Sequence, residues 1–414
     1  MIRSRTPLGV AGTVAAVGAS LAFGAAPGYA DGAARPGIAY GWGINNFGQA
    51  GAGTTVYQYN TPQRTVLPDG VAQLQSGGRA GYARLADGRL LSWGYNLNAA
   101  LGNGSTMAST RSTPAPVLGI GGTGTLTGVV DVSVHMESAI AAVLADGTVV
   151  AWGSNVNRQL GDGSTASVRA FPERVLTAPD TPLTGAVDVE SGVEASYALM
   201  ADGTVTAWGA VKCDGALAGT TQYATAVAGL TDIRQIAVAG GVALFRRADG
   251  AVLSCGGEGP TLGRPFGRLN SPTSAYVPVQ VTDLGPGSDV VDISISAAAT
   301  ALTGDGRVYL WGDNVQNQLT PLGVPGNVMV PTELVRPAGE PKIVDVENDN
   351  SPTTYAVRAD GSMLVWGQNQ FGMAGIGTTG TNVNTPTVLS VPGRAFAGVA
   401  ASNWSVLAVT VPAV

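Results

Sequence analysis

Charged residues and histidine are scarce in this chain of 414 residues. Only 12% of the residues are charged, the net charge is −6, and no basic cluster is longer than Arg246–Arg247. Nucleic acid is therefore not an expected partner, because its phosphates require a stripe of Lys and Arg. His135 is the only histidine, and with no cysteine or second histidine nearby it cannot form a usual metal site. We expect no metal and no other cofactor, and we interpret His135 as structural.

Long apolar runs are also lacking, except at the N-terminus. Arg3 and Arg5 precede an apolar stretch from Leu8 to Ala26, and small residues follow up to Ala30. This pattern is typical of a secretory signal peptide; the alternative, a membrane anchor, is disfavoured because glycines interrupt the stretch. The Ala- and Gly-rich leader is typical of a bacterium. We expect a signal peptide (1–30), a short linker (31–36) and one secreted domain (37–414) that has no contact with the membrane after cleavage and is a monomer.

Glycine and proline, in contrast, are abundant, with 60 and 24 residues. They interrupt every window long enough for a helix of three turns, so turns and strands are favoured. Six Asp-Gly pairs recur at steps of 47 to 59 residues. Their aspartates are Asp87, Asp146, Asp202, Asp249, Asp305 and Asp360. Six residues after each aspartate stands a residue followed by Gly, namely Trp93, Trp152, Trp208, Cys255, Trp311 or Trp366.

The spacing is that of a repeated supersecondary unit of about 55 residues. Apolar runs flank each Asp-Gly pair, which predicts two strands joined by a tight hairpin. A further strand precedes each hairpin, as in "VVDVSV" and "AVDVES", and about four strands per unit is the content of one propeller blade. The sequence therefore predicts an all-β, seven-bladed β-propeller with four-stranded blades.

The seventh unit is split between the two ends of the chain. "GIAYGWG" (37–43) contains Trp42 without an Asp-Gly pair before it, and "NWSVLAVT" (403–410) reads like a unit cut off before that pair. Pairing of these two segments would remove both exposed sheet edges. We therefore expect the ring to be closed by the N- and C-terminal strands.

The hairpin, the Trp-Gly pair and the tail "WGSNVNRQLG" (152–161) together resemble the regulator of chromosome condensation repeat family. The resemblance covers residues 37 to 411 and implies a seven-bladed propeller. It departs from the family where a histidine usually precedes the hairpin, because Ala80, Ala139, Ala195 and Trp404 stand there. Fold resemblance alone does not fix an activity.

The repeated side chains have structural interpretations. The Asp-Gly aspartates fit turn geometry, and the tryptophans, including Trp42, fit packing between neighbouring sheets. Asn45, Asn96, Asn155, Asn314 and Asn369 follow their tryptophans by three residues and are interpreted as bonding to their own loops, with glycan binding as the alternative.

The two cysteines, Cys213 and Cys255, have only each other as intramolecular partners. Cys213 lies five residues after Trp208, and Cys255 occupies the tryptophan position of the next blade, so both are expected near one level of adjacent sheets. An exported chain meets an oxidising environment. Either a disulfide or two free thiols is compatible with the sequence, because a bridge requires a Cα separation below roughly 7 Å.

Without a catalytic constellation, the sequence favours a secreted, non-catalytic module that binds another protein. An inhibitor of a secreted enzyme such as a β-lactamase, as in one secreted group of similar architecture, and a guanine nucleotide exchange factor, as in the family founder, are alternatives by resemblance. A polysaccharide-acting enzyme or lectin is a third, but such an enzyme needs two carboxylates at a defined separation. No paired acids are expected outside the turns.

The segments after each Trp-Gly pair begin on one rim of the ring and vary in composition, as binding loops do. Their aromatic and arginine side chains are the type that dominates protein interfaces, the alternative being local packing against the blades. The candidate interface residues are Tyr57, Tyr59, Arg169, Phe171, Tyr223, Phe266, Arg268 and Tyr276.

Overall fold

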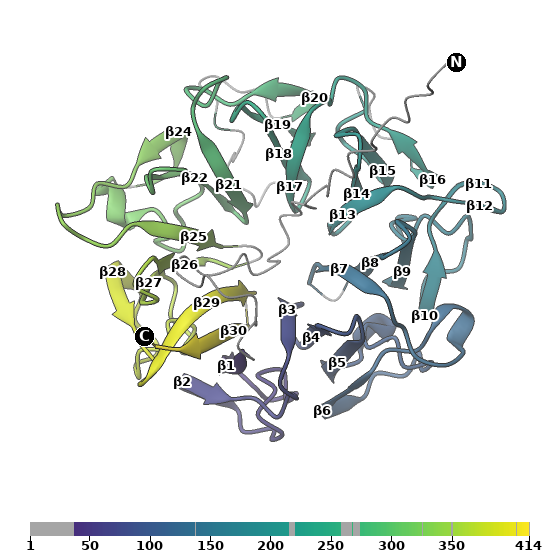
Figure 1. Cartoon of the computed structure of the whole chain (residues 1–414), viewed down its shortest axis with the longest axis horizontal. Helices are drawn as coiled ribbons and strands as arrows, with labels where there is room; N and C mark the ends of the chain where they lie inside the picture. The colour runs from purple at the N-terminus through teal and green to yellow at the C-terminus, as the bar shows by residue number, and fades with distance from the viewer. Residues whose placement is uncertain are drawn as a thin grey trace, which may run out of the picture.

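Seven four-stranded antiparallel sheets surround a central axis in the computed structural model, so the predicted propeller is confirmed (Figure 1). The structure describes residues 37–413, except 137, 215–219, 258–266, 268–273, 325, 349–350 and 403. The first strand of each blade lies nearest the axis and the fourth lies outside. The expected signal peptide and linker fall outside the described residues.

Each blade from the second to the seventh is built from strands that are consecutive in sequence. Blade 2 contains β3 (Val71–Ser76), β4 (Ala80–Leu85), β5 (Leu90–Tyr95) and β6 (Thr110–Pro116). Blade 3 contains β7 (Val129–Val134), β8 (Ala139–Leu144), β9 (Val149–Ser154) and β10 (Val168–Arg174). Blade 4 contains β13 (Ala186–Ser191), β14 (Ala195–Met200), β15 (Val205–Gly209) and β16 (Thr221–Ala226).

The remaining consecutive blades follow the same order. Blade 5 contains β17 (Ile233–Ala239), β18 (Val242–Arg247), β19 (Val252–Gly257) and β20 (Ser274–Gln280). Blade 6 contains β21 (Val290–Ile295), β22 (Ala298–Thr303), β23 (Val308–Gly312) and β24 (Val328–Glu333). Blade 7 contains β25 (Ile343–Glu347), β26 (Thr353–Arg358), β27 (Met363–Gly367) and β28 (Val383–Leu389). A small ribbon of β11 (Leu176–Ala178) and β12 (Thr181–Pro182) links blades 3 and 4.

Helix is limited, in the described part of the chain, to three 3-10 turns: η1 (Leu97–Ala99), η2 (Ile120–Gly122) and η3 (Thr320–Leu322). None of these has the length and hydropathy needed to cross a membrane.

Blade 1 closes the ring with strands from both ends of the chain. Its order is β29 (Arg394–Ala401), β30 (Ser405–Pro412), β1 (Ile38–Ile44) and β2 (Gln58–Arg64). The β1 and β30 strands pair antiparallel from Ile38 opposite Thr410 to Gly43 opposite Ser405. The predicted closure is confirmed, and it converts what would be two open sheet edges into a continuous blade.

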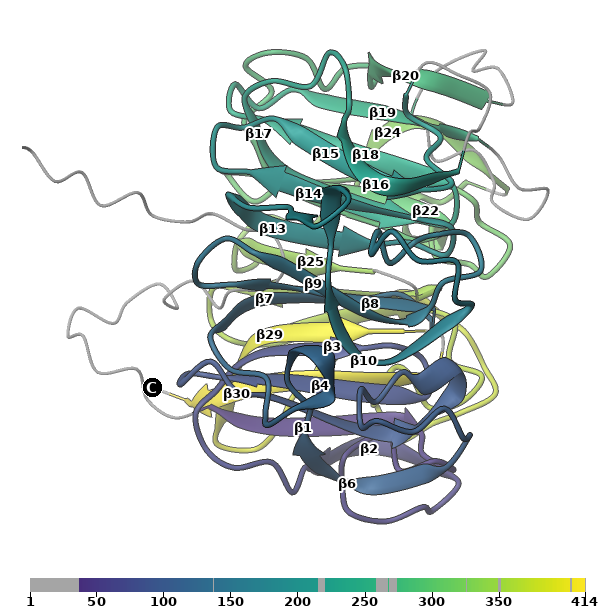
Figure 2. The ribbon, with the colours of Figure 1, turned by 90° about the vertical axis from the view of Figure 1, so that its right-hand side faces the viewer.

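The strands end at two rims. The Asp-Gly turns and the connections between blades form one, here called the DG rim. The loops from first to second strand and the long loops after each Trp-Gly pair form the other, the WG rim. In Figure 2 the strands run across the view, with the C-terminus and the DG rim on the left.

The hydrophobic core lies between the blades. The described buried side chains form seven clusters, one at each interface of neighbouring blades. Six of the clusters contain a fully buried tryptophan from the sheet position identified in the sequence. Each such side chain removes a large apolar area from water, which makes the interfaces the main source of stability.

The tryptophans also bond across these interfaces. The Nε1 of Trp208, for example, donates to the Gln159 carbonyl of the preceding blade at 2.8 Å. Gly161 lies against the same indole with a φ of 62°, and a Cβ there would come within 2.7 Å of Trp208. The last glycine of the repeat tail is therefore required both by a left-handed backbone and by the close approach of the indole.

The interface of blades 4 and 5 differs from the other six. Cys255 takes the tryptophan position, and its Sγ is bonded to that of Cys213, with a Cα separation of 5.5 Å. Both side chains are buried in the cluster between these blades. A covalent bond thus links the blades where an indole would otherwise lie.

Candidate functional site

The six Asp-Gly aspartates are used in their own turns. In each, Oδ1 accepts a hydrogen bond from the backbone N–H two residues later, as from Thr148 to Asp146 at 2.9 Å. This bond is the main reason why the pKa of Asp146 is lowered. The carboxylates are spread around the DG rim, one in each of blades 2 to 7, which does not bring two of them to one reacting atom.

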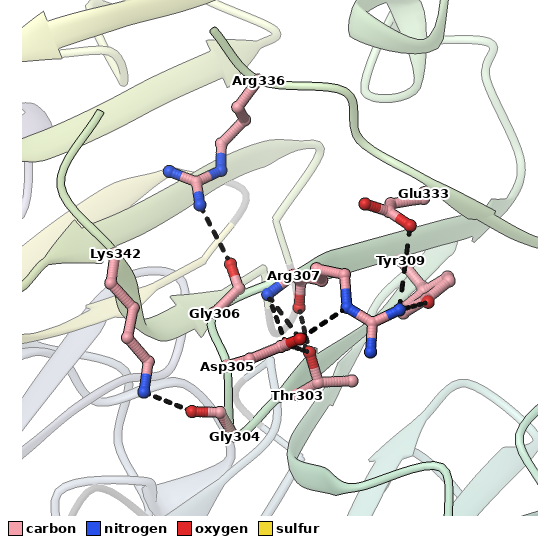
Figure 3. Close-up of polar contacts among 9 residues, drawn as sticks. All are labelled: Thr303, Gly304, Asp305, Gly306, Arg307, Tyr309, Glu333, Arg336 and Lys342. Atoms are coloured by element: carbon pink, nitrogen blue, oxygen red, sulfur yellow. Dashed lines mark hydrogen bonds and ion pairs between the residues drawn. The ribbon is translucent and has the colours of Figure 1, made fainter. Parts of the chain in front are cut away.

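The turn of blade 6 on the DG rim takes part in a network of polar contacts (Figure 3). Arg307 Nε pairs with Asp305 Oδ2 at 2.9 Å, and its Nη1 donates to the Tyr309 hydroxyl at 2.8 Å. From the connection to blade 7, Arg336 and Lys342 donate to the Gly306 and Gly304 carbonyls. These two side chains therefore hold the connection to blade 7 against the turn of blade 6.

Paired acids do occur outside the turns, so that expectation was wrong. Asp131 of blade 3 lies against Asp188 of blade 4, and both are buried. Burial raises the pKa of Asp131. Its oxygens accept from Gln73 Nε2 at 2.9 Å and from the Val189 backbone N–H at 3.0 Å. The pair is thus enclosed in the wall between blades, away from any substrate.

This series of buried, hydrogen-bonded polar side chains occurs twice. Arg84 donates to Gln73, which donates to Asp131; in the second copy Arg246 donates to Gln235 at 3.0 Å, and Gln235 to Asp292 at 2.7 Å. The first copy spans blades 2 to 4 and the second spans blades 5 to 7, where the Val346 N–H reaches Asp292. Burial raises the pKa of Asp292 as well. Each series of hydrogen bonds thus links the inner strands of neighbouring blades.

The repeated asparagines bond to their own loops, as predicted. Each Oδ1 accepts from the backbone N–H five residues later, as from Leu160 to Asn155 at 3.1 Å. All five side chains are buried. Their amides fix the shape of the WG-rim loops and are not presented to a glycan.

The structure separates the candidate interface residues into several settings. Tyr57 is 59% exposed on the WG rim, whereas the Tyr59 hydroxyl bonds to Thr54 Oγ1 at 2.7 Å. Arg169 is paired with Asp162 at 2.7 Å. Tyr276 is half-buried in β20.

Two further candidates pack against glycines of neighbouring elements. A Cβ on Gly122 would lie 3.0 Å from the Phe171 ring, and one on Gly163 would lie 2.8 Å from the Tyr223 ring. Phe266 and Arg268 lie outside the described residues. The six described candidates therefore have different settings, and most of them are engaged in contacts within the chain.

A different set of side chains does gather on the WG rim. The Arg79 guanidinium lies over the Phe47 ring at 5.6 Å and over the Trp404 ring at 5.4 Å. Phe47 stacks on Tyr95 with ring centroids 4.4 Å apart, and Trp404 stacks on Phe371 at 5.9 Å. All five side chains are half-buried. We call this set, from blades 7, 1 and 2, the aromatic–arginine stack.

Exposed apolar side chains accompany the stack. Eight of the large apolar side chains that the structure describes as exposed lie in WG-rim loops, and only Val66 and Val335 lie in DG-rim connections. Tyr57 and Met107, the latter 75% exposed, belong to the same blades as the stack. The WG rim is thus the rim on which most of these exposed apolar side chains lie.

No metal-binding group of three or more His, Cys, Asp or Glu side chains is found within the described ranges. His135 is buried where β7 ends. The aromatic and arginine side chains gathered on the WG rim are of the type that binds protein surfaces.

A ring of seven four-stranded blades, with one hairpin and tail repeated around it, defines a repeat β-propeller that presents loops on one rim. Residues 146–199, from the turn of blade 3 into blade 4, match the family described as Regulator of chromosome condensation (RCC1) repeat. The chain therefore carries a repeat of this family at residues 146–199.

Three known proteins illustrate the relationship. The human E3 ubiquitin-protein ligase HERC2 is 28% identical over 390 residues, which cover 90% of this chain and 8% of HERC2. The human probable E3 ubiquitin-protein ligase HERC6 is 31% identical over 271 residues, which cover 62% of this chain and 25% of HERC6. This chain thus spans a quarter or less of either relative.

Among solved structures, Prp20p from Saccharomyces cerevisiae superposes with a TM-score of 0.75 at 19% identity, over 92% of both chains. At that identity the likeness concerns the fold. Prp20p is a protein whose binding to Gsp1p and histones has been characterised.

Proposed function

We propose that the chain is a secreted, non-catalytic propeller that binds another protein through the WG rim over blades 7, 1 and 2. The observation that carries the proposal is the aromatic–arginine stack, together with exposed Tyr57 and Met107 in WG-rim loops of blades 1 and 2. Aromatic and arginine side chains on a rigid scaffold contribute most of the energy of protein interfaces. Similar propellers bind proteins, as Prp20p does.

Two features support export. The N-terminal sequence has the pattern of a signal peptide, and the disulfide between Cys213 and Cys255 is a bond that persists in oxidising compartments. The absence of catalysis is supported by the positions of the carboxylates, because the turn aspartates serve their own backbones and Asp131 is buried. With the leader removed, residues 31–414 would form the exported protein.

The test uses residues 31–414 as bait for the secreted fraction of the source organism. A retained partner is then measured against the double variant Tyr57→Ala/Met107→Ala. We expect its affinity to fall at least tenfold, since exposed anchors contribute to binding and little to folding. The matched control on the opposite rim, Val66→Ala/Val335→Ala, should bind as the parent does. Loss of binding in the control variant only would overturn the assignment of the rim.

A further inference from the structure

Asp-Gly and Asn-Gly pairs are sites where a polypeptide can rearrange without an enzyme. The backbone nitrogen of the glycine attacks the side-chain carbonyl carbon of the preceding residue, and a five-membered succinimide ring forms with loss of water from Asp or ammonia from Asn. Glycine favours this attack because it has no side chain to obstruct the nitrogen. The described part of the chain contains nine such pairs, whose settings can be compared.

Six of the pairs are the repeated turns, and in these turns both reacting groups are engaged. The glycine N–H donates to the carbonyl three residues earlier, as from Gly203 to Met200 at 2.9 Å. The preceding carboxylate accepts hydrogen bonds, as Asp202 does from the hydroxyl and the backbone N–H of Thr204, and these bonds lower its pKa. A carboxylate that stays ionised is a poor electrophile, so these turns are protected in two ways.

Two further pairs lie in WG-rim loops, and a strand of the next blade holds the glycine of each. Gly104, which follows Asn103, donates its N–H to the Ala170 carbonyl at 2.9 Å. The glycine of the other pair, Gly163, donates to the Gln222 carbonyl at 3.2 Å. In all eight of these pairs the glycine nitrogen must therefore lose a hydrogen bond before it can attack.

The ninth pair, Asp69 and Gly70, is arranged differently. It lies in the connection from blade 1 to blade 2 on the DG rim. Asp69 is exposed, and neither its carboxylate nor the Gly70 N–H is hydrogen-bonded to a residue that the structure describes. The Gly70 carbonyl, in contrast, accepts from the backbone N–H of Ala86 in the blade 2 turn at 2.8 Å. The two reacting groups are thus free in a segment that is held at the carbonyl that follows them.

We infer that Asp69 and Gly70 form a site of spontaneous aspartate isomerisation in the folded protein. The Gly70 nitrogen attacks the Asp69 Cγ, the proton of the N–H and the carboxyl hydroxyl leave as water, and water then reopens the succinimide at either of its two carbonyls. Opening at one carbonyl restores aspartate, and opening at the other gives isoaspartate, in which the main chain runs through Cβ and Cγ. One water is lost and one is gained, so the product has the mass of the parent and no oxidant or other reactant is needed.

Isomerisation would change how blade 1, which closes the ring, is joined to blade 2. The main chain gains the Cβ atom of Asp69 and becomes longer, which displaces the Gly70 carbonyl from the Ala86 N–H. A chain that persists after export would therefore accumulate, with time, a population in which this connection is loosened.

The test incubates folded residues 31–414 at neutral pH, digests samples taken over time and separates the peptides. The peptide that contains residues 69–70 should split into two species of equal mass, whereas the peptides with the other eight pairs should not. Asp69→Glu should abolish the splitting, because a glutamate side chain would have to form a six-membered ring. Since Asp69 is exposed, this variant should melt as the parent does.

Asp69→Asn provides a faster reaction with a control in the same chain, because Asn103 is the second Asn-Gly pair. In the folded variant, position 69 should release ammonia at least about tenfold faster than Asn103, since Asn103 reacts only after the Gly104 N–H has left Ala170. In urea neither pair is held, and the two rates should converge. Mass spectrometry of the two peptides measures both rates.

Two results would overturn the inference. One is equal deamidation of position 69 and Asn103 in the folded Asp69→Asn variant. The other is a parent whose peptide with residues 69–70 stays single while the protein is folded and splits only in urea, because the folded conformation would then protect this pair as it protects the others.

Discussion

The Sγ atom of Cys255 is bonded to Cys213 at a level of the ring where other blades place an indole N–H against a carbonyl of the preceding blade. The fifth blade therefore lacks the large side chain that fills the other interfaces and has a covalent bond instead. Only this interface depends on the redox state of its surroundings.

Removing the disulfide should destabilise the ring. The bond closes a segment with a sequence separation of 42, for which the loop-entropy relation gives about 4 kcal/mol as an upper figure. We expect Cys213→Ser/Cys255→Ser to lower the free energy of unfolding by about 2–4 kcal/mol in urea titrations. The parent, unfolded without reductant, should show no thiol; two thiols in that assay would contradict the bond.

Tryptophans at different positions should differ in their effect on stability. Trp42 is fully buried and its Nε1 donates to the Met373 carbonyl at 2.7 Å, so Trp42→Ala should cost about 3–5 kcal/mol. Trp404 is half-buried on the rim, and Trp404→Ala should cost only about 1 kcal/mol. Thermal melts of the two variants provide the comparison. Equal losses would mean that Trp404 is part of the core.

Gly121 serves as the control for a substitution of Gly161, the last glycine of the repeat tail. Both have positive φ, 62° and 67°, but a Cβ on Gly121 meets nothing within 4 Å, while one on Gly161 meets Trp208. Alanine should impose the backbone strain at both positions and an overpacking cost only at Gly161, an excess of about 1–3 kcal/mol. Chemical denaturation of both variants measures that excess, and an excess near zero would show that the indole moves aside.

The buried pair of Asp131 and Asp188 should make stability depend on pH. Burial raises the pKa of Asp131 in the folded state, so the folded chain holds a proton that the unfolded chain releases. This contribution is fully present below the unfolded pKa, about 3.9, and is lost as pH rises through the folded pKa.

Asp188→Asn should reduce that loss, because its amide can donate to Asp131 at any pH. Between pH 5 and pH 8.5 the parent should lose more stability than this variant. Urea titrations at both pH values give the difference. Asp202→Asn, in an exposed turn, serves as the control and should follow the parent over this range. If the stability of Asp188→Asn and of the parent changed equally with pH, a raised pKa of Asp131 in the folded state would be contradicted.

The fold could be predicted because its determinants repeat. The Asp-Gly turn, the buried tryptophan and the loop asparagine recur at fixed spacing, and each has one local function that does not depend on distant contacts. Ring closure was predictable because residues 37–43 and 403–410 each contain half of a unit, and the two halves complete one sheet.

The candidate site was not predictable in the same way. Phe47 and Phe371 both follow a repeat tryptophan by five residues, but Arg79 and Tyr95 are not part of the repeated pattern, and only the ring brings the four together. The sequence had pointed to Trp404 at the position of the usual histidine, but this alignment was wrong by one residue, because Ser405 pairs with Gly43 as Ala80 pairs with Gly94. The two series of buried, hydrogen-bonded side chains were not predicted for another reason. Asp131 was assigned to an apolar strand, although a repeated acid in such a strand indicates a hydrogen-bonded interior position.

The aromatic–arginine stack contains residues from both ends of the chain, which are synthesised at different times. Phe47 lies near the start of the chain and Trp404 near its end, on the two halves of blade 1 that meet through β1 and β30. A nascent or truncated chain therefore has no stack, and a ligand that binds the stack would favour the closed ring over the open one by mass action. Binding at this surface would thus require both halves of blade 1 to be present, and the ligand would stabilise the closed ring.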